Sequence, residues 1–213
     1  MTSKFQLFCP KWYFHSSLST RDQHITQKLF EDLISDDEHF HQPKTWNCNV
    51  QSSWENLPEP DGPWDEWISI INPIWGEFIE TIGTHCNVDI IFRDAWINKY
   101  NSGDSQEMHD HCDSQCNLSM VYFHTLNDDD GCQFQFCNTE HSSYQMQGLD
   151  VLKIPVFPLT IPKISQGDIL IFPSHYYHLV SPHKGTKTRV TFSLNFEITP
   201  IPLSDVTQSQ RED

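Results

Sequence analysis

The sequence predicts a mainly β protein, a sandwich or barrel of short strands with helices that buttress one of its sheets. Two observations predict this fold. Apolar residues recur at helical spacing in the first 85 residues, and from about residue 86 they alternate with their neighbours at a period of two. Because the helices come first and the short strands follow with turn signals between them, we expect the strands to form the core.

One domain is expected over residues 1–213. A chain of 213 residues with 37% hydrophobic composition is long enough for a single hydrophobic core, and no internal repeat or low-complexity linker divides it. We expect a helical and irregular part at 1–85, the β core at 86–199 and a frayed polar tail at 200–213.

Two helices are predicted in the N-terminal part. The first covers about 21–35, where four apolar residues recur at helical spacing and Thr20 is a candidate N-cap. The second covers about 63–82, and Asp61 and Pro63 suit its start. Pro73 lies inside the apolar stripe of this second helix, so we expect a kink or a break there.

The strands of the β core are predicted from their alternation and from the turns between them. Asp129-Asp130-Gly131 is a turn signal before one strand, and Gly167 precedes another. The expected strands lie near 94–100, 118–123, 132–136, 168–172 and 189–196. These strands should belong to two packed sheets that face one cavity.

The bulk composition excludes some partners and locations. A formal net charge of −16 repels nucleic-acid backbones and anionic membranes, so neither is an expected partner. No segment approaches the roughly 20 apolar residues of a membrane span, and the N-terminus lacks the apolar run of a signal peptide. Seven Cys without a secretory signal indicate reduced thiols, so we expect a cytoplasmic protein. The oligomeric state cannot be read from the sequence.

A cluster of His and Asp residues is the strongest chemical signal. His109, His111 and Asp113 are spaced by two, so in an extended segment neighbouring pairs can point at one metal ion. The best candidate for a distant third ligand is His178. Two His and a carboxylate with open positions are the arrangement of iron(II) oxygenases, but three imidazoles would also hold a divalent metal. The pattern alone therefore leaves His109 and Asp113 as alternatives.

Other readings of this cluster are weaker. The His pair could lie in a polar surface loop without any ligand role. A zinc site could use Cys112 and Cys116 with one of the His residues. However, Cys112 and His111 are adjacent and would point to opposite faces of an extended chain.

A second signal follows His178. Arg189 lies eleven residues later and begins an alternating strand whose polar face also carries Thr191, Ser193 and Asn195. Such a face is commonly solvated. Arginine, however, is suited to bidentate capture of a carboxylate, and a hydroxyl of Thr191 or Ser193 on the same face could support it.

These motifs resemble a known family. WINKYNSGD at 96–104, HDHCDS at 109–114, LSMVYF at 118–123 and GDILIFPSHYYHLVSPHKGTKTRVTFSLNF at 167–196 are similar to the 2-oxoglutarate/iron(II) oxygenase family that has many bacterial and phage members. The resemblance covers most of the chain and is specific over 96–123 and 167–196. It implies a double-stranded β-helix, also called a jelly roll, with Fe(II) and 2-oxoglutarate as cofactors.

The resemblance also implies roles for individual residues. His109, His111 and His178 match the metal ligands of the family, and Arg189 matches its carboxylate-binding arginine. Asp113 stays an alternative ligand or a residue that orients an imidazole. Three further residues on matching strands are expected to line the 2-oxoglutarate pocket, namely Asn98, Tyr100 and Tyr122.

The implied activity is that of a 2-oxoglutarate- and Fe(II)-dependent dioxygenase. It would couple decarboxylation of 2-oxoglutarate to succinate with C–H oxidation, usually hydroxylation, and would use O2. The substrate is not readable, and a protein side chain, a free amino acid or a small metabolite all remain open. Two alternatives are a cupin-like metal-dependent enzyme without 2-oxoglutarate and a non-catalytic jelly-roll binding module.

Overall fold

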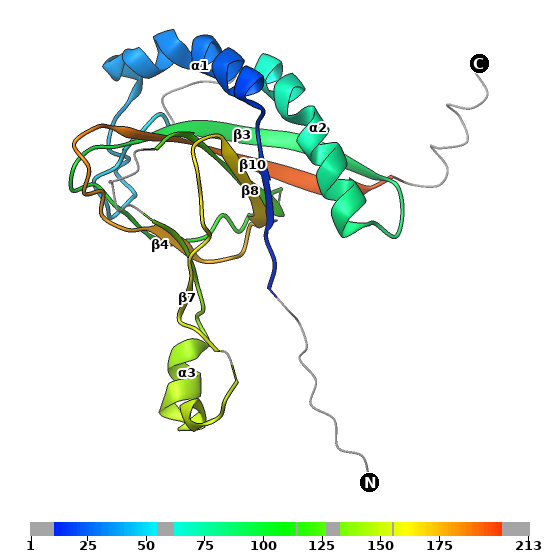
Figure 1. Cartoon of the computed structure of the whole chain (residues 1–213), viewed down its shortest axis with the longest axis vertical. Helices are drawn as coiled ribbons and strands as arrows, with labels where there is room; N and C mark the ends of the chain where they lie inside the picture. Colours follow the sequence, from blue (N-terminus) through cyan, green and yellow to red (C-terminus); the bar gives the residue numbers. More distant parts are fainter. Residues whose placement is uncertain (1–10, 55–61, 114, 127–132, 155, 202–213) are drawn as a thin grey trace.

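Two antiparallel β-sheets packed face to face form the protein, as a computed structural model shows (Figure 1). The structure describes residues 11–54, 62–113, 115–126, 133–154 and 156–201. The large sheet has the strand order β1-β8-β5-β10-β3-β2 and the small sheet the order β4-β9-β6-β7. This mainly β architecture confirms the predicted jelly roll.

The predicted strands all form where the structure describes them. The large sheet contains β1 (Phe14–Ser17), β2 (Gln51–Ser52), β3 (Val88–Tyr100), β5 (Leu118–Thr125), β8 (Asp168–Pro173) and β10 (Arg189–Pro200). The small sheet contains β4 (Gln106–His109), β6 (Phe134–Cys137), β7 (Leu159–Thr160) and β9 (His178–Val180). Residue 132, Asp61 and most of the expected tail lie outside the described residues. Two strands, β1 and β2, come from the part expected to hold only helices and loops.

Helices α1 (Thr20–Ser35) and α2 (Trp64–Ile82) cover the outer face of the large sheet (Figure 1). The prediction of Thr20 as N-cap was wrong by one residue, because Ser19 Oγ accepts the hydrogen bond from the Asp22 backbone N–H. The helices are tied together inside the core, where Trp67 Nε1 donates to Thr26 Oγ1 at 3.1 Å.

Helix α2 continues through Pro73, so of the predicted kink or break, the break does not occur. Proline removes one backbone hydrogen bond from a helix interior, which usually interrupts it. Here residues on both sides of Pro73 are buried against the sheet, including Ile71, Ile74 and Trp75. Packing of both halves offsets the missing bond.

No helix in the described part of the chain is long and apolar enough to cross a membrane.

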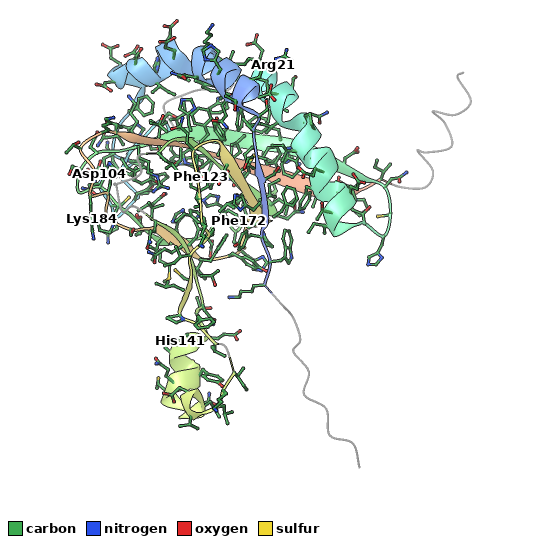
Figure 2. The ribbon with its side chains drawn as sticks, in the orientation of Figure 1. Arg21, Asp104, Phe123, His141, Phe172 and Lys184 are labelled. Atoms are coloured by element: carbon green, nitrogen blue, oxygen red, sulfur yellow. The ribbon has the colours of Figure 1, made fainter. Side chains whose placement is uncertain are left out.

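Two hydrophobic clusters lie on opposite faces of the large sheet. One joins the sheet to the helices and includes Phe30, Trp67 and Phe192. The other lies between the sheets and includes Phe123 and Phe172, which Figure 2 labels in that space. The large sheet is therefore covered on both faces, and polar side chains on its inner face are shielded from water.

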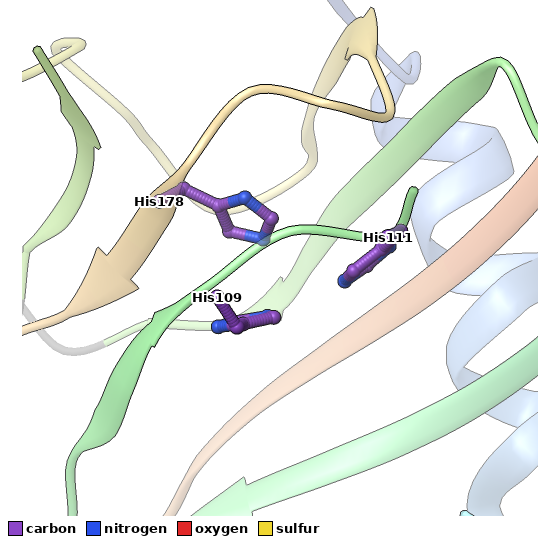
Figure 3. A group of neighbouring side chains, drawn as sticks. All are labelled: His109, His111 and His178. Carbon is purple, nitrogen blue, oxygen red and sulfur yellow. The ribbon is translucent and has the colours of Figure 1, made fainter. Parts of the chain in front are cut away.

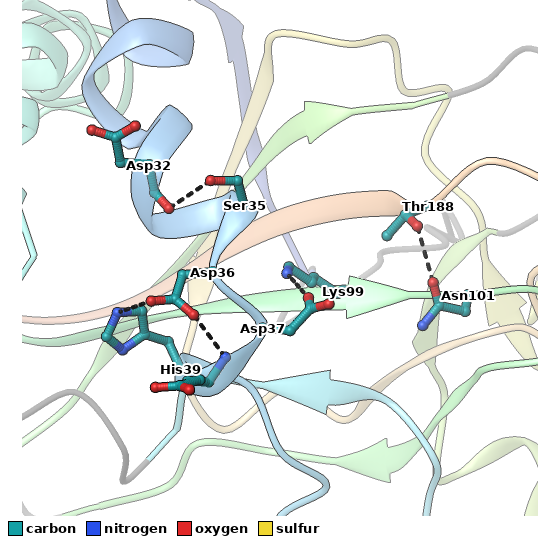
Figure 4. Close-up of polar contacts among 9 residues, drawn as sticks. Asp32, Ser35, Asp36, Asp37, His39, Lys99, Asn101 and Thr188 are labelled. Atoms are coloured by element: carbon teal, nitrogen blue, oxygen red, sulfur yellow. Dashed lines mark hydrogen bonds and ion pairs between the residues drawn. The ribbon is translucent and has the colours of Figure 1, made fainter.

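A set of polar contacts attaches the end of α1 to β3 (Figure 4). Lys99 points to the helix side of the sheet, where its Nζ donates to Asp37 Oδ1 at 2.8 Å in the short helix η1 (Asp37–His39). The ammonium also lies 3.7 Å from the centroid of the Phe40 ring. Because strand residues alternate in direction, anchoring Lys99 outward directs its neighbours Asn98 and Tyr100 inward.

An excursion between β6 and β8 projects away from the sheets (Figures 1 and 2). It contains α3 (His141–Met146), the 3-10 helix η2 (Leu149–Val151) and β7, which pairs with β6. The sequence reading did not foresee these helices.

Candidate metal centre

Three imidazoles meet between the two sheets, from His109, His111 and His178 (Figure 3). One ring nitrogen from each lies within 4.8 Å of the other two. His109 ends β4 and pairs in register with His178, which begins β9 on the neighbouring strand. His111 follows β4 in an irregular segment, where its backbone N–H donates to Ser174 O at 2.9 Å. The His-x-His and the distal His predicted from the sequence are thus brought together.

Hydrogen bonds at Nδ1 orient all three rings. The His109 Nδ1 lies 2.8 Å from Glu107 O and the His178 Nδ1 lies 2.9 Å from Tyr176 O. A carbonyl oxygen can only accept, so each of these Nδ1 atoms carries the hydrogen and the opposite nitrogen, Nε2, has a lone pair available for a metal.

The third ring is held from β10 and β5. The His111 Nδ1 lies 2.9 Å from Asn195 Oδ1 and 3.1 Å from Ser119 Oγ, and the Ser119 hydroxyl also donates to Asn195 Oδ1. Asn195 and Ser119 face each other in the register of the two strands. Sequence reasoning placed Asn195 on the polar face of its strand but gave it no role.

Burial keeps these imidazoles uncharged. Burial lowers the pKa of His109, and it lowers the pKa of His111 to about 4, with the charge of His109 as a second cause. Burial also places the pKa of His178, which is 3% exposed, well below its ordinary value. Neutral imidazole is the form that binds metal, so the three rings are ready to act as ligands near neutral pH.

The other proposed ligands lie apart from this group. Among the described residues, the group of close ligand atoms contains neither Asp113 nor a Cys. Asp113 is exposed, and its Oδ1 accepts from the Gln115 backbone N–H at 2.9 Å. Cys112 is exposed while Cys116 is buried, and the Cys116 Sγ contacts Leu118 O. The alternative zinc site with two Cys therefore does not form.

The polar face of β10 points into the space beside the imidazoles. Arg189, Thr191 and Ser193 line a small cavity together with His109 and His178. Arg189 is only 1% exposed, and its guanidinium carbon lies 5.5 Å from the Tyr100 ring centroid and 5.6 Å from that of Phe123. This face is therefore buried rather than solvated, which favours the carboxylate-binding interpretation of Arg189.

The expected lining residues divide between the two faces of the sheet. Tyr100 lines the cavity, and its hydroxyl donates to Gln106 Oε1 at 2.7 Å. Asn98 is buried and donates to Ser193 Oγ at 3.3 Å. Tyr122, in contrast, packs on the helix side against Trp67 and Phe192. The expectation that Tyr122 lines the cavity does not fit this position, because the next residue, Phe123, occupies the inner face.

Comparison with known proteins agrees with this geometry. Residues 94–195 match the family model described as "Putative 2OG-Fe(II) oxygenase", where 2OG is 2-oxoglutarate. A search of curated proteins finds no match.

Solved structures with the same fold include several 2OG enzymes. A Pseudomonas putida prolyl-4-hydroxylase has a TM-score of 0.58 at 14% identity, covering 88% of this chain and 92% of that one. A viral collagen prolyl hydroxylase from Paramecium Bursaria Chlorella virus-1, in a 2OG complex, has a TM-score of 0.53 at 15% identity, covering 90% and 97%. A Trichoplax adhaerens prolyl hydroxylase, bound to a hypoxia inducible factor peptide fragment, has a TM-score of 0.58 at 14% identity, covering 86% and 82%.

At these identities the likeness shows the fold alone. The family match spans β3 to β10, which hold the three imidazoles and Arg189, and the cofactors of that family are Fe(II) and 2-oxoglutarate. Residues 94–195 of this chain therefore match the 2OG-Fe(II) oxygenase family, and the protein is an enzyme of that class.

Proposed function

We propose that the protein is a hydroxylase that holds Fe(II) with His109, His111 and His178 and 2-oxoglutarate with Arg189. The observation that carries this proposal is the convergence of three neutral, hydrogen-bonded imidazoles next to a buried arginine. The donor set fits a divalent first-row metal, because imidazole suits iron and the rings come from separate segments that close around one point.

The choice between His109 and Asp113 rests on placement. The imidazole of His109 lies beside that of His178, with ring centroids 4.2 Å apart, whereas the Asp113 carboxylate is exposed. Three neutral ligands leave the full charge of +2 on the metal, which suits a dianion such as 2-oxoglutarate.

The remaining residues of the cavity would bind and orient 2-oxoglutarate. Arg189 would hold the far carboxylate in a fork of two N–H donors, and Thr191 or Ser193 would add a hydroxyl. Burial strengthens this charge pair because little water screens it. Tyr100 and Phe123 pack around the guanidinium and exclude water from it. Tyr122 has no place in this arrangement.

When bound, Fe(II) with 2-oxoglutarate and O2 supplies an oxidative decarboxylation to succinate and carbon dioxide that is coupled to oxidation of a substrate C–H bond. The protein contributes ligands, orientation and a water-poor site. A polypeptide substrate is a reasonable candidate, since one structural neighbour is a prolyl hydroxylase bound to a peptide.

The direct test is succinate release from 2-oxoglutarate by the purified protein with Fe(II) and O2, screened across peptides, amino acids and metabolites. The proposal expects release that needs all three components and is lost in His178→Ala. Release that His178→Ala retains, or an oxidation that proceeds without 2-oxoglutarate, would contradict it and favour the cupin-like alternative.

A further inference from the structure

A cleft opens beside the imidazoles, and four carboxylates form part of its wall. Its volume is about 560 Å³, within the roughly 300–1,000 Å³ of ligand-binding pockets. The carboxylates belong to Asp94, Glu107, Asp110 and Asp113, and His109 and His111 line the same cleft. The cleft therefore leads directly to the proposed metal centre, which makes it the place where a substrate would bind.

The wall carries an excess of negative charge. Among the described residues, the one cationic side chain that lines the cleft is Arg93, and its guanidinium is ion-paired with the carboxylate of Glu197. The four carboxylates thus face a single cation that already has a partner outside the cleft. A positively charged group that enters the cleft would be attracted by this wall, and an anionic group would be repelled.

Indole rings form another part of the wall. Trp46 and Trp54 have ring centroids 6.4 Å apart, and Trp54 meets Trp96 edge to face at 4.6 Å. The Trp96 ring centroid lies 5.3 Å from that of His111. The rings thus connect the cleft wall with the metal centre. Tryptophan is the side chain whose face attracts a cation most strongly, and carboxylates next to such faces add charge attraction.

The third indole provides an observation independent of charge. Trp96 is 3% exposed, and within the part of the chain that the structure describes its buried Nε1 has no hydrogen-bond acceptor. A buried indole N–H normally has a partner. Because Trp96 lines the cleft beside His111, an oxygen atom of a bound substrate can supply that acceptor.

We propose that the cleft selects substrates whose side chain ends in an ammonium or a guanidinium and that carry an acceptor oxygen on the carbonyl or carboxylate of the same residue. The carboxylates and the indole faces hold the cation, and the Trp96 N–H holds the oxygen. This inference rests on the proposed function, since it names the substrate class of that same site. The cation can belong to a free basic amino acid or to a Lys or Arg residue of a polypeptide, both of which carry a carbonyl or carboxylate oxygen.

The test uses matched pairs that differ in charge. The full chain with Fe(II), 2-oxoglutarate and O2 is given peptide pools with Lys, Arg, norleucine or citrulline at the central position, and the same four as free amino acids. We expect succinate release with Lys or Arg to exceed that with the neutral partner by about tenfold or more. Comparison of the peptide and free amino-acid arms identifies the source of the cation. If no cationic compound exceeds its neutral partner, the inference is wrong.

Two variants test whether side chains of the cleft wall bind the cationic group of the substrate. Trp54→Leu removes a π face and keeps an apolar side chain, while Asp110→Asn removes a charge and retains the oxygen that accepts from the Cys112 backbone N–H. Each should raise the KM of the cationic substrate by about 3- to 10-fold with little change in kcat. Glu80→Gln, an exposed acid on α2, is the matched control and should behave as wild type. An unchanged KM in both wall variants would overturn the inference.

A separate readout distinguishes the two proposals. Binding of 2-oxoglutarate to the Mn(II)-loaded protein needs no substrate and depends only on the proposed metal and carboxylate sites. If that binding occurs and charge preference is absent, the cationic-substrate inference fails and the proposed function stands. If 2-oxoglutarate does not bind, the proposed function fails and the inference fails with it.

Discussion

Removal of the Arg189 side chain should abolish tight binding of 2-oxoglutarate and leave metal binding intact. In Arg189→Ala the far carboxylate of 2-oxoglutarate would enter a buried cavity without its cationic partner. The three imidazoles belong to β4, β9 and the segment after β4, whereas Arg189 begins β10. The substitution therefore changes the cavity without altering the residues that hold the metal.

The size of the effect follows from burial. Arg189 is 1% exposed and lies near two aromatic rings, so little water screens the charge pair. Truncation of one member of a buried, hydrogen-bonded charge pair costs about 2–5 kcal/mol. At about 1.4 kcal/mol for each factor of ten, this loss corresponds to a rise in Kd of roughly 30- to 4,000-fold.

Calorimetric titration of 2-oxoglutarate into the Mn(II)-loaded protein measures this rise without turnover. Arg189→Lys keeps the charge but loses the fork of donors, so it should lie between wild type and Arg189→Ala. Arg21→Ala, an exposed arginine on α1, is the matched control. An unchanged Kd in Arg189→Ala, with thermal denaturation showing a folded protein, would refute the role of Arg189.

Three further predictions concern the metal, the pH response and the core. Metal content measured by mass spectrometry should fall far more in His109→Ala than in Asp113→Ala, and the reverse order would make Asp113 the ligand. The metal-free protein should lose stability as pH falls from about 6.5 to about 4, because the unfolded chain binds a proton at His111 that the folded chain, with its pKa lowered to about 4, does not. The contribution of His111 to this loss is about 3 kcal/mol in urea unfolding, and His111→Asn should lack it. If His111→Asn loses as much stability over this pH range as wild type, the burial argument is wrong. Thr26→Val should cost about 1–3 kcal/mol of unfolding free energy because it leaves the buried Trp67 N–H without its acceptor, and an unaltered urea midpoint would show that this bond contributes little.

The alternation of β10 could be read from the sequence because both of its faces carry a local marker. Its outer residues, such as Phe192, are apolar and meet the helices, and its inner residues are polar and begin with Arg189. A strand has a period of two, so this pattern predicts which residues share a face without knowledge of any contact. The spacing of two between His109 and His111 also indicated that their imidazoles could meet, although His111 lies after the end of β4 in an irregular segment, where strand alternation does not apply.

The face of Tyr122 could not be read in this way. Strand β5 is buried on both sides, between the helices and the small sheet, and each face carries one polar residue, Ser119 on the inner face and His124 on the helix side. Polarity therefore does not mark which face is the inner one. The indoles of Trp46 and Trp54 were missed for another reason. They lie in loop segments that reach the metal centre only through contacts distant in sequence, such as that between Trp54 and Trp96.

The central claim is that three imidazoles hold the metal and Arg189 holds 2-oxoglutarate beside it. A crystal structure of the protein with Mn(II) and 2-oxoglutarate tests this claim most directly. We expect the Nε2 atoms of His109, His111 and His178 at about 2.0–2.3 Å from the metal, and the far carboxylate of 2-oxoglutarate paired with Arg189. A metal bound through an Asp113 oxygen with His109 remote, or 2-oxoglutarate held away from Arg189, would contradict the claim.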